Sequence, residues 1–419
     1  MGLLSERTFE EAIECALLAG GPDACGSDKT VISEPASAFG PFASGGFRKR
    51  RHEDFDRALC LIPKDVLDFI YATQPAEWAK YKQQHGDDAK QKFLKRLSKQ
   101  IESRGALYVF RRPLRDSGCK FDLAYFRPHS GLNEDLQRLY DANLFSVVRQ
   151  MHYSEKSEQS LDAGIFLNGI PVFTAELKNP LTQQTVADAI RQYRTDRDPR
   201  EPLLSYGRCL AHFAVDPNLV YVTTRLAGRD TVFLPFNRGW DGGAGNPPPS
   251  VTNGGYATSY LWERVWARDS ILDLIRQFIH EVAPETEKGA KKGKPFLVFP
   301  RYHQLQAVRG MVADAREKGA GKSYLGRQRQ DVHDRVAGAP SVRPPRRERR
   351  PRFRFDRRDH RPPRARPAAA GGHAALRADA RRARKHRQDV APAQGCARER
   401  KNDHRDDAPK VSGDREPDQ

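Results

Sequence analysis

Short runs rich in apolar residues, many of them β-branched or aromatic, are densest between residues 144 and 224. Such runs predict strands, and their apolar character on both faces indicates strands that belong to a core. The expected strands are 144–154, 163–169, 170–178, 209–216 and 219–224, with a helix at 185–197 between the third strand and the fourth. This β-β-β-α-β order predicts an α/β (α+β) domain whose mixed sheet has a helix packed on it.

The segments on either side of this sheet are predicted to be mainly helical. Apolar residues at helical spacing predict helices at 8–21, 54–81, 92–105 and 259–283, and the runs 106–112 and 121–128 are predicted to form further strands. Trp262 and Trp266 lie four residues apart in the longest of these helices. We expect both indoles to pack in the core rather than to stack on nucleic-acid bases.

Composition predicts a soluble protein of the cytoplasm. The six cysteines are widely spaced and include no CxxC pair, a pattern that favours reduced thiols over a disulfide framework. No apolar run is long enough to span a bilayer, and the acidic, amphipathic N-terminus is unlike a secretion signal.

The net charge of +18 is concentrated in the last part of the chain. Residues 324–419 hold 27 Lys and Arg against 14 Asp and Glu, and they contain two Leu and no Ile, Met or Trp. Such a segment cannot bury enough apolar surface to fold, so it is predicted to be disordered. This mixture of Arg, Pro, Ala, Gly and Asp is typical of GC-rich coding DNA read out of frame. A frameshifted, non-native tail is therefore favoured over a natural basic arm that binds nucleic acid.

Three residues of the sheet region carry candidate chemistry. Asp162 stands at the start of one predicted strand, and Glu176 and Lys178 stand two residues apart near the end of the next. Two carboxylates and a backbone carbonyl make a hard-oxygen site suited to Mg²⁺. A nearby ammonium can orient an attacking water and offset the charge that develops on a phosphate.

The turn between these strands decides whether the two acids share a face. A two-residue turn at Asn168 and Gly169 would pair Asp162 with Ala175, whereas a three-residue turn with a bulge at Gly169 would pair it with Glu176. The metal-site hypothesis therefore predicts the bulged, three-residue turn. An ExK triplet by itself is a weak signal, and the alternative is an ion pair at a solvated strand end.

These residues resemble the PD-(D/E)xK nuclease core at the N-terminus of the motor-nuclease (R) subunit of type I restriction enzymes. The likeness extends over most of residues 1–323 and is carried by "NLFSVVRQMHYS", "FLNGIPVFTAELKNP" and "AIRQYRTDRDPREPL". The resemblance implies a restriction-endonuclease-like fold that hydrolyses DNA, with Asp162 and Glu176 holding Mg²⁺ and Lys178 assisting catalysis. In the family a glutamate of the first helix commonly completes the site.

Three further site assignments follow from the same resemblance. Glu10 is the preferred first-helix glutamate, with Glu6 and Glu11 as alternatives. The family's QxxxY element falls on the helix after ExK, and here Gln192 and Tyr193 would position DNA, although Ala189 stands where the family has its Gln.

The segment "GAGKS" (319–323) looks like a phosphate-binding loop, but it is predicted to be a decoy. The pattern requires a glycine where Arg316 stands, and the loop follows an amphipathic helix rather than a buried strand. That helix resembles the first helix of superfamily 2 motors, in which a glutamine contacts the adenine of ATP. Gln304 would be the matching residue here. ATP is thus a cofactor of the full-length family, with no phosphate loop in this chain. An ATPase is the least supported function.

The resemblance also predicts the order of domains. A PD-(D/E)xK endonuclease-like domain (1–283) would be followed by a charged linker (284–295), a truncated start of a helicase/ATPase motor (296–323) and the tail (324–419). The expected function is a Mg²⁺-dependent endonuclease acting on double-stranded DNA, with the methylation (M) and specificity (S) subunits as partners. The alternative is a non-catalytic fragment that binds DNA or those partners.

Overall fold

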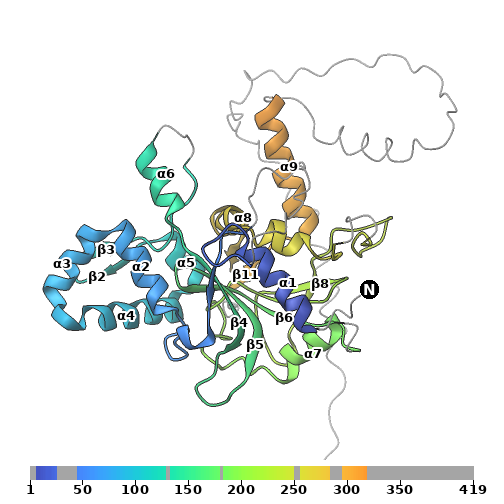
Figure 1. Ribbon diagram of the computed structural model, residues 1–419, viewed down its shortest axis with the longest axis horizontal. Coiled ribbons are helices and arrows are strands. Elements are labelled where there is room, and N and C mark those ends of the chain that lie inside the picture. Colours follow the sequence, from blue (N-terminus) through green and yellow to red (C-terminus); the bar gives the residue numbers. More distant parts are fainter. Residues whose placement is uncertain are drawn as a thin grey trace, which may run out of the picture. The chain divides into compact units, whose positions relative to one another are not determined.

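A seven-stranded mixed sheet forms the centre of the computed structural model (Figure 1). The structure describes residues 6–25, 45–128, 133–179, 183–249, 255–283 and 295–318. The strands of this sheet are β1 (Arg48–Arg50), β4 (Phe145–His152), β5 (Ser160–Leu167), β6 (Ile170–Leu177), β7 (Ala211–Val215), β8 (Val220–Thr223) and β9 (Leu234–Pro235).

The strand order in the sheet is β1-β4-β5-β6-β7-β8-β9. The pairs β1–β4 and β6–β7 are parallel, and the other neighbouring pairs are antiparallel. The predicted mixed sheet is therefore confirmed, and so is the β-β-β-α-β order, since α7 (Val186–Thr195) connects β6 to the parallel strand β7. Parallel neighbours require such a crossover connection.

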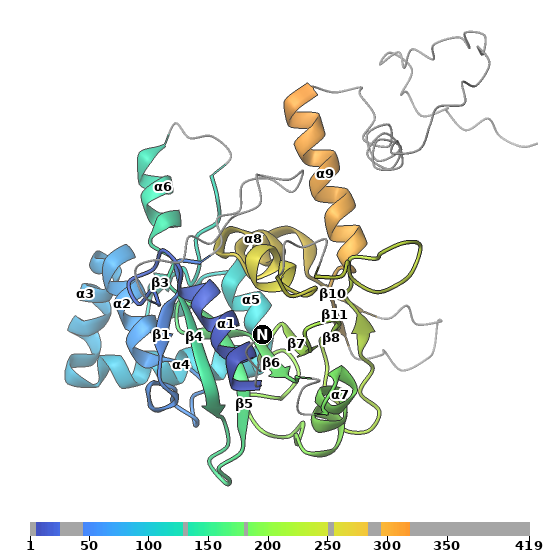
Figure 2. The ribbon, with the colours of Figure 1, turned by 45° about the vertical axis from the view of Figure 1, so that its right-hand side comes forward.

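Helices cover both faces of this sheet. Figures 1 and 2 show α2, α3 and α4 gathered with the β2–β3 hairpin at one side, while α1 and α7 lie near β5 and β6. The other helices are α1 (Glu6–Leu18), α2 (Pro63–Thr73), α3 (Pro75–His85), α4 (Ala89–Arg104), α5 (Ala106–Arg111), α6 (Glu134–Asp141), α8 (Arg268–Asp273) and α9 (Tyr302–Lys318). The remaining strands are β2 (Leu114–Asp116), β3 (Cys119–Phe121), β10 (His280–Val282) and β11 (Phe296–Val298).

Two hydrophobic clusters hold the sheet between its helices. The larger cluster joins α1, α2, α4, α5 and α8 to one face, where Val147, Ile165 and Phe173 point. The smaller cluster joins α7 to the other face, where Val148 and Phe166 point. This division follows from the period of two along each strand, because neighbouring residues such as Val147 and Val148 enter different clusters.

Three sequence predictions outside the central sheet are wrong. Residues 106–111 form the helix α5, which begins after Gly105 in the left-handed region (φ 81°) with the Ala106 N–H bonded to the Gly207 carbonyl. Of the run 121–128 only Phe121 belongs to a strand. The helix predicted over 259–283 is broken into two π-helical turns (261–265 and 274–278), α8 and the strand β10. Trp262 and Trp266 are buried as expected.

The cysteine prediction needs a correction at one place. Cys15 and Cys25 form a disulfide between α1 and the turn after it, whereas Cys60, Cys119 and Cys209 are free and buried. Their burial raises the pKa of the thiols of Cys60 and Cys119. Across the described segments, no helix is long and apolar enough to cross a membrane.

Residues 296–305 pack on the same core as the sheet. Strand β11 pairs with β10 in an antiparallel ladder, and Leu297, Phe299, Tyr302 and Leu305 belong to the larger hydrophobic cluster. The first part of the predicted motor segment thus shares its core with the predicted endonuclease domain. The expected linker residues 284–294, the "GAGKS" segment and the tail 324–419 lie outside the described residues.

Candidate active site

The β5–β6 hairpin places two acids opposite each other. Ala163 pairs with Ala175. The next pair in the same antiparallel register is Asp162 with Glu176, as the metal-site hypothesis requires. The hydrogen bond from the Leu177 N–H to Asp162 Oδ2 (2.7 Å) shows that Asp162 faces the end of β6.

The turn that joins β5 to β6 differs from the predicted turn, although the register near Asp162 is the required one. Leu167 pairs with Ile170, so Asn168 and Gly169 form a two-residue turn in which both residues have positive φ (51° and 75°). The predicted three-residue turn is therefore wrong. The extra residue lies farther along β6, since Phe166 pairs with Pro171 but Ile165 pairs with Phe173.

Proline explains why the bulge lies inside the strand. Pro171 has no N–H to donate to the ladder, and proline within a sheet is found mainly at edges and bulges. The skipped residue, Val172, uses its carbonyl to accept a hydrogen bond from the Leu210 N–H instead (2.9 Å). Because this bulge shifts the register by one residue, it brings Asp162 and Glu176 to the same face.

Lys178 lies beside Asp162 and lines a pocket next to the two acids. Its Nζ is 3.7 Å from Asp162 Oδ2, and both side chains keep about a tenth of their surface exposed (10% and 12%). A polar pocket of about 240 Å³ next to them is lined by Lys178, Gln184, Asp188, Arg191, Gln192 and Asp196. Gln192, predicted to position DNA, thus lies on the open side of the candidate site.

Glu176 is completely buried and belongs to an ion pair. Its Oε1 accepts a hydrogen bond from Arg197 Nε (2.7 Å), and Arg197 also donates to the Ser160 carbonyl (2.7 Å). Glu176 Oε2 has no hydrogen-bond partner among the described residues. Burial raises the pKa of Glu176 well above its ordinary value of 4.5 and Asp162 raises it further, while Arg197 and Lys178 offset part of this.

The raised pKa of Glu176 gives a testable dependence of stability on pH. Between pH 4.5 and its raised pKa in the folded metal-free protein, the carboxyl of Glu176 is ionised more in the unfolded chain than in the folded one, so the free energy of unfolding falls as the pH rises through this range. We expect Glu176→Gln to remove this contribution and to flatten the decline. Urea unfolding in EDTA from pH 4.5 to 8 measures it; equal slopes in parent and variant would contradict the assignment.

Helix α1 brings Glu10 to the same site. Glu10 is buried, accepts hydrogen bonds from Gln150 Nε2 (3.0 Å to Oε1) and Arg149 Nη2 (3.1 Å to Oε2), and has its pKa raised, first by burial and then also by Asp162. Of its alternatives, Glu11 is only partly buried, and the side chain of Glu6 lies outside the described residues. The structure therefore places the carboxylate of Glu10 against β4, where its partner Gln150 also lies 3.5 Å from Asp162.

Tyr193 is packed within the protein core. Its ring is fully buried in the α7 cluster, and its hydroxyl hydrogen-bonds with Thr174 Oγ1 (2.9 Å), which in turn bonds His212 Nδ1 (2.7 Å). In the free protein Tyr193 anchors α7 on the sheet, and its predicted role in positioning DNA stays a prediction. The same burial lowers the pKa of His212 to about 3.

Sequence reasoning missed four polar residues of this site. Arg149 and Gln150 contact Glu10, Arg197 pairs with Glu176, and Glu14 bonds to Arg149 (3.2 Å). Arg149 and Gln150 could have been found from the sequence, because this polar pair interrupts the mainly apolar strand "LFSVVRQMHYS". Arg197 gave no comparable signal, since it stands at the polar end of a predicted helix.

The donor set fits one hard cation between Asp162 and Glu176. Glu176 has a buried carboxylate oxygen without a hydrogen-bond donor, and Asp162 Oδ1 has only a long contact of 3.5 Å from Gln150 Nε2. Carboxylate oxygens of this kind are the ligands that Mg²⁺ prefers. No group of three or more His, Cys, Asp and Glu side chains suited to a metal occurs in the described parts of the chain. The direct ligands of a cation here would be the carboxylates of Asp162 and Glu176, with Glu10 next to them and not itself a ligand.

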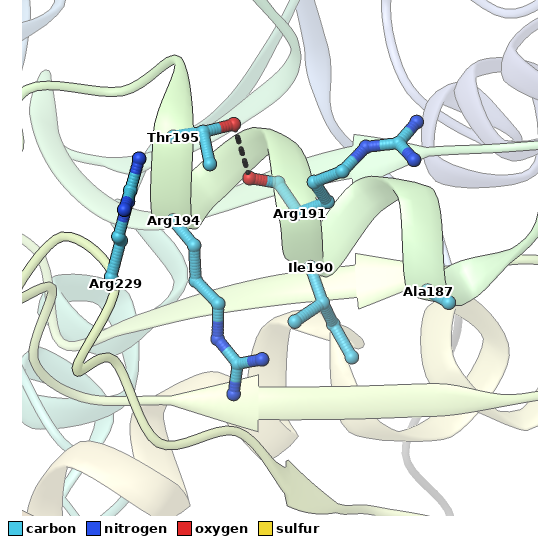
Figure 3. A pocket seen from close by; sticks show the side chains of 6 residues that line it. All are labelled: Ala187, Ile190, Arg191, Arg194, Thr195 and Arg229. Atoms are coloured by element: carbon cyan, nitrogen blue, oxygen red, sulfur yellow. Dashed lines mark hydrogen bonds between the residues drawn. The ribbon is translucent and has the colours of Figure 1, made fainter.

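Arginines continue from this site along the outer side of α7. Figure 3 shows Arg191 and Arg194 leaving α7 in different directions, with Arg229 beside them. A second pocket is lined by Ala187, Ile190, Arg191, Arg194, Thr195 and Arg229. Arg191 lines both pockets and is paired with Asp188 (2.7 Å), and Asp196 also lines the pocket beside Lys178.

Gln304 does not lie in a nucleotide pocket of the described chain. It is exposed near the start of α9, where its Oε1 accepts a hydrogen bond from the Arg301 N–H (3.0 Å). This contact satisfies a backbone donor just before the helix begins. The adenine contact implied by the resemblance has no counterpart among the described residues.

In one comparison with known proteins the central part of the chain matches a family model. Residues 67–231 match the family model of the type I restriction enzyme R protein N terminus. This range contains Asp162, Glu176, Lys178 and Arg197 but not Glu10. No curated protein matches the chain.

Proposed function

We propose that residues 67–231, which belong to the family of type I restriction enzyme R protein N termini, form the core of a Mg²⁺-dependent endonuclease that hydrolyses phosphodiester bonds of double-stranded DNA. The observation that carries the proposal is the strand register that sets Asp162 opposite Glu176, with Lys178 Nζ 3.7 Å from Asp162. Family membership supports a nuclease-related role, and this geometry supplies the residues for it.

Asp162 and Glu176 would hold the cation through their oxygens that lack close donors. Mg²⁺ bound there would supply Lewis acidity at the scissile phosphate. Lys178, on the open side, would orient the attacking water and stabilise the negative charge that develops as the new phosphorus–oxygen bond forms and the bond to the sugar oxygen breaks. The Leu177 N–H fixes Asp162 for this role by binding its other oxygen.

Arg197 would keep the site intact before the cation binds. A carboxylate as deeply buried as Glu176 is strongly destabilised unless a positive charge compensates it. Arg197 supplies this charge at 2.7 Å and is itself held by the Ser160 carbonyl and by the ring of Tyr153, whose centroid is 5.8 Å away. Its role would be positioning, since it does not line the pocket beside Lys178.

The proposed partners are double-stranded DNA and the methylation (M) and specificity (S) subunits of a type I restriction complex. The family supports DNA and complex partners in general, and these two subunits are proposed from the resemblance. ATP would act only through a motor region, and the site around Asp162 does not use it. The proposed cofactor of this site is Mg²⁺.

Cleavage of supercoiled plasmid DNA by the purified chain tests the proposal. We expect nicked and linear DNA with Mg²⁺ and intact plasmid with EDTA. DNA binding without cleavage at every Mg²⁺ concentration would support the alternative, a non-catalytic fragment that binds DNA or partner subunits.

DNA contact along α7 predicts a change in the salt dependence of binding. Arg191→Ala is expected to reduce the slope of log K against log salt by about 1, because one phosphate contact is lost. Arg138→Ala on α6 is a matched control, since both arginines are exposed (72% and 78%) and each pairs with an aspartate three residues earlier. Fluorescence anisotropy in Ca²⁺ measures both, and equal slopes for the two variants would argue against contact at α7.

A further inference from the structure

Gln150 lies between the carboxylates of Glu10 on α1 and Asp162 on β5. Its Nε2 donates to both oxygens of Glu10 on α1 (3.0 and 3.2 Å) and is 3.5 Å from Asp162 Oδ1 on β5. Its Oε1 accepts a hydrogen bond from the Ser160 hydroxyl (3.2 Å). This last bond fixes the orientation of the amide, so that the donor side of Gln150 faces the acids.

The backbone at Gln150 is unusual for a strand residue. Its φ is +46°, in the left-handed region that residues other than Gly, Asn and Asp rarely adopt. Gln150 occupies the position opposite Asp162, between the pairs Arg149–Ala163 and Met151–Leu161 of the β4–β5 ladder. Strained backbone of this kind persists where the surrounding structure holds it in place, and such positions cluster at functional sites.

Two consecutive residues of β4 consequently bind one carboxylate. Neighbouring side chains of a regular strand point to opposite faces, yet Arg149 Nη2 and Gln150 Nε2 both donate to Glu10. Arg149 also binds Glu14 one turn farther along α1 (3.2 Å). The left-handed backbone at Gln150 interrupts the regular pleat at the place where α1 docks on β4.

Glu10 and Asp162 are like charges in a buried setting, and each repels the other. A neutral amide that donates to both reduces this repulsion, in addition to the ion pair that Arg149 makes with Glu10 (3.1 Å). Gln150 is therefore suited to hold Glu10 near Asp162 while leaving their charge available to a metal.

We propose that Gln150 is a positioning residue that holds the carboxylate of Glu10 beside Asp162, next to the metal site, where its charge strengthens cation binding. This inference rests on the proposed function and adds a residue through which the helix-borne carboxylate takes part. Partners that orient metal ligands typically change metal affinity or activity by about 10- to 100-fold when they are removed.

Gln150→Gly tests the role of the amide separately from that of the backbone. Glycine adopts the left-handed conformation without strain, so the variant loses the side chain but not the backbone shape. We expect the half-saturating Mg²⁺ concentration for cleavage, and the Mg²⁺ dissociation constant measured by calorimetry, to rise by about 10- to 100-fold. The urea midpoint should stay close to that of the parent. Asp241→Gly is the matched control, because Asp241 has a similar φ (47°) in an exposed loop.

A second variant shows whether Gln150 acts through Glu10. If it does, Glu10→Gln combined with Gln150→Gly binds Mg²⁺ no more weakly than Glu10→Gln alone, because the carboxylate to be positioned is already gone. Additive losses would overturn the inference, as would parental Mg²⁺ binding and cleavage in Gln150→Gly. The parent is measured first. If it neither binds Mg²⁺ nor cuts DNA, the proposed function fails and the role of Gln150 fails with it.

Discussion

Lys178→Ala is expected to lower the rate of Mg²⁺-dependent DNA cleavage about 100- to 1000-fold, the usual effect of removing one group that stabilises developing charge. The ammonium of Lys178 lies 3.7 Å from Asp162 at the open side of the site, where it can reach a phosphate. The lysine is not a proposed metal ligand, so Mg²⁺ binding should persist. Single-turnover cleavage of supercoiled plasmid gives the rate, and calorimetry gives the Mg²⁺ affinity.

Lys120→Ala is the matched control for this prediction. Lys120 is an exposed lysine on the short strand β3, outside the residues that line the candidate site. Its variant should cleave DNA at the parental rate. A Lys178→Ala protein that keeps more than about a tenth of the parental rate would exclude the assigned role, because that loss falls below the range expected for such a group.

Arg197→Met is expected to destabilise the metal-free protein by about 3–5 kcal/mol, the typical cost of removing one partner of a buried ion pair. The loss arises because Glu176, which is fully buried, would keep its charge without compensation or would have to bind a proton. Urea unfolding in EDTA at pH 7 measures the change. Mg²⁺ should restore part of the lost stability, because a bound cation replaces the missing positive charge.

The double variant Arg197→Met with Glu176→Leu separates the ion pair from simple packing. Replacing both partners of a buried pair by apolar groups is often neutral, so the double variant should recover most of the stability that Arg197→Met loses. Arg200→Met is the control, since Arg200 pairs with Asp198 in solvent and should leave stability unchanged. A double variant as unstable as Arg197→Met would show that the loss comes from packing and not from charge.

Short apolar runs were the most informative pattern in the sequence. Those within residues 144–224 predicted the strands β4 to β8, with Asp162 at the start of one strand and Glu176 and Lys178 near the end of the next. The register at Ala163 and Ala175, which sets Asp162 opposite Glu176, is the one the metal-site hypothesis requires, but it arises from a bulge and not from the predicted turn. A bulge at Val172 and a three-residue turn shift the register equally, and the missing N–H of Pro171 was the local sign of which one occurs.

Where the predicted secondary structure was wrong, contacts with distant parts of the chain determine the observed structure. The run 106–111 has the β-prone residues of a strand, but Gly105 turns the chain and Ala106 bonds to Gly207, far away in the sequence. The apolar pattern of 259–283 is helical, yet it is interrupted by π-helical turns that no local signal marks. Burial in the large cluster overrode local preference in both places.

The residues that support the candidate site could not be predicted from the sequence, for a related reason. Arg197 and Gln150 act through partners that are 21 and 140 residues away in the sequence, Glu176 and Glu10. Spacing along one element cannot reveal such contacts, because they depend on how α1 and the segment after α7 dock on the sheet. The buried position of Tyr193 was missed likewise, since Thr174 and His212 come from other elements.

The most direct measurement is anomalous X-ray diffraction from crystals of the chain grown with Mn²⁺ in place of Mg²⁺. We expect one strong anomalous peak between the carboxylates of Asp162 and Glu176, and no peak there in crystals of Glu176→Ala. A peak elsewhere, or none at this position in the parent at saturating Mn²⁺, would contradict the assignment of these two acids as the ligands of a catalytic cation.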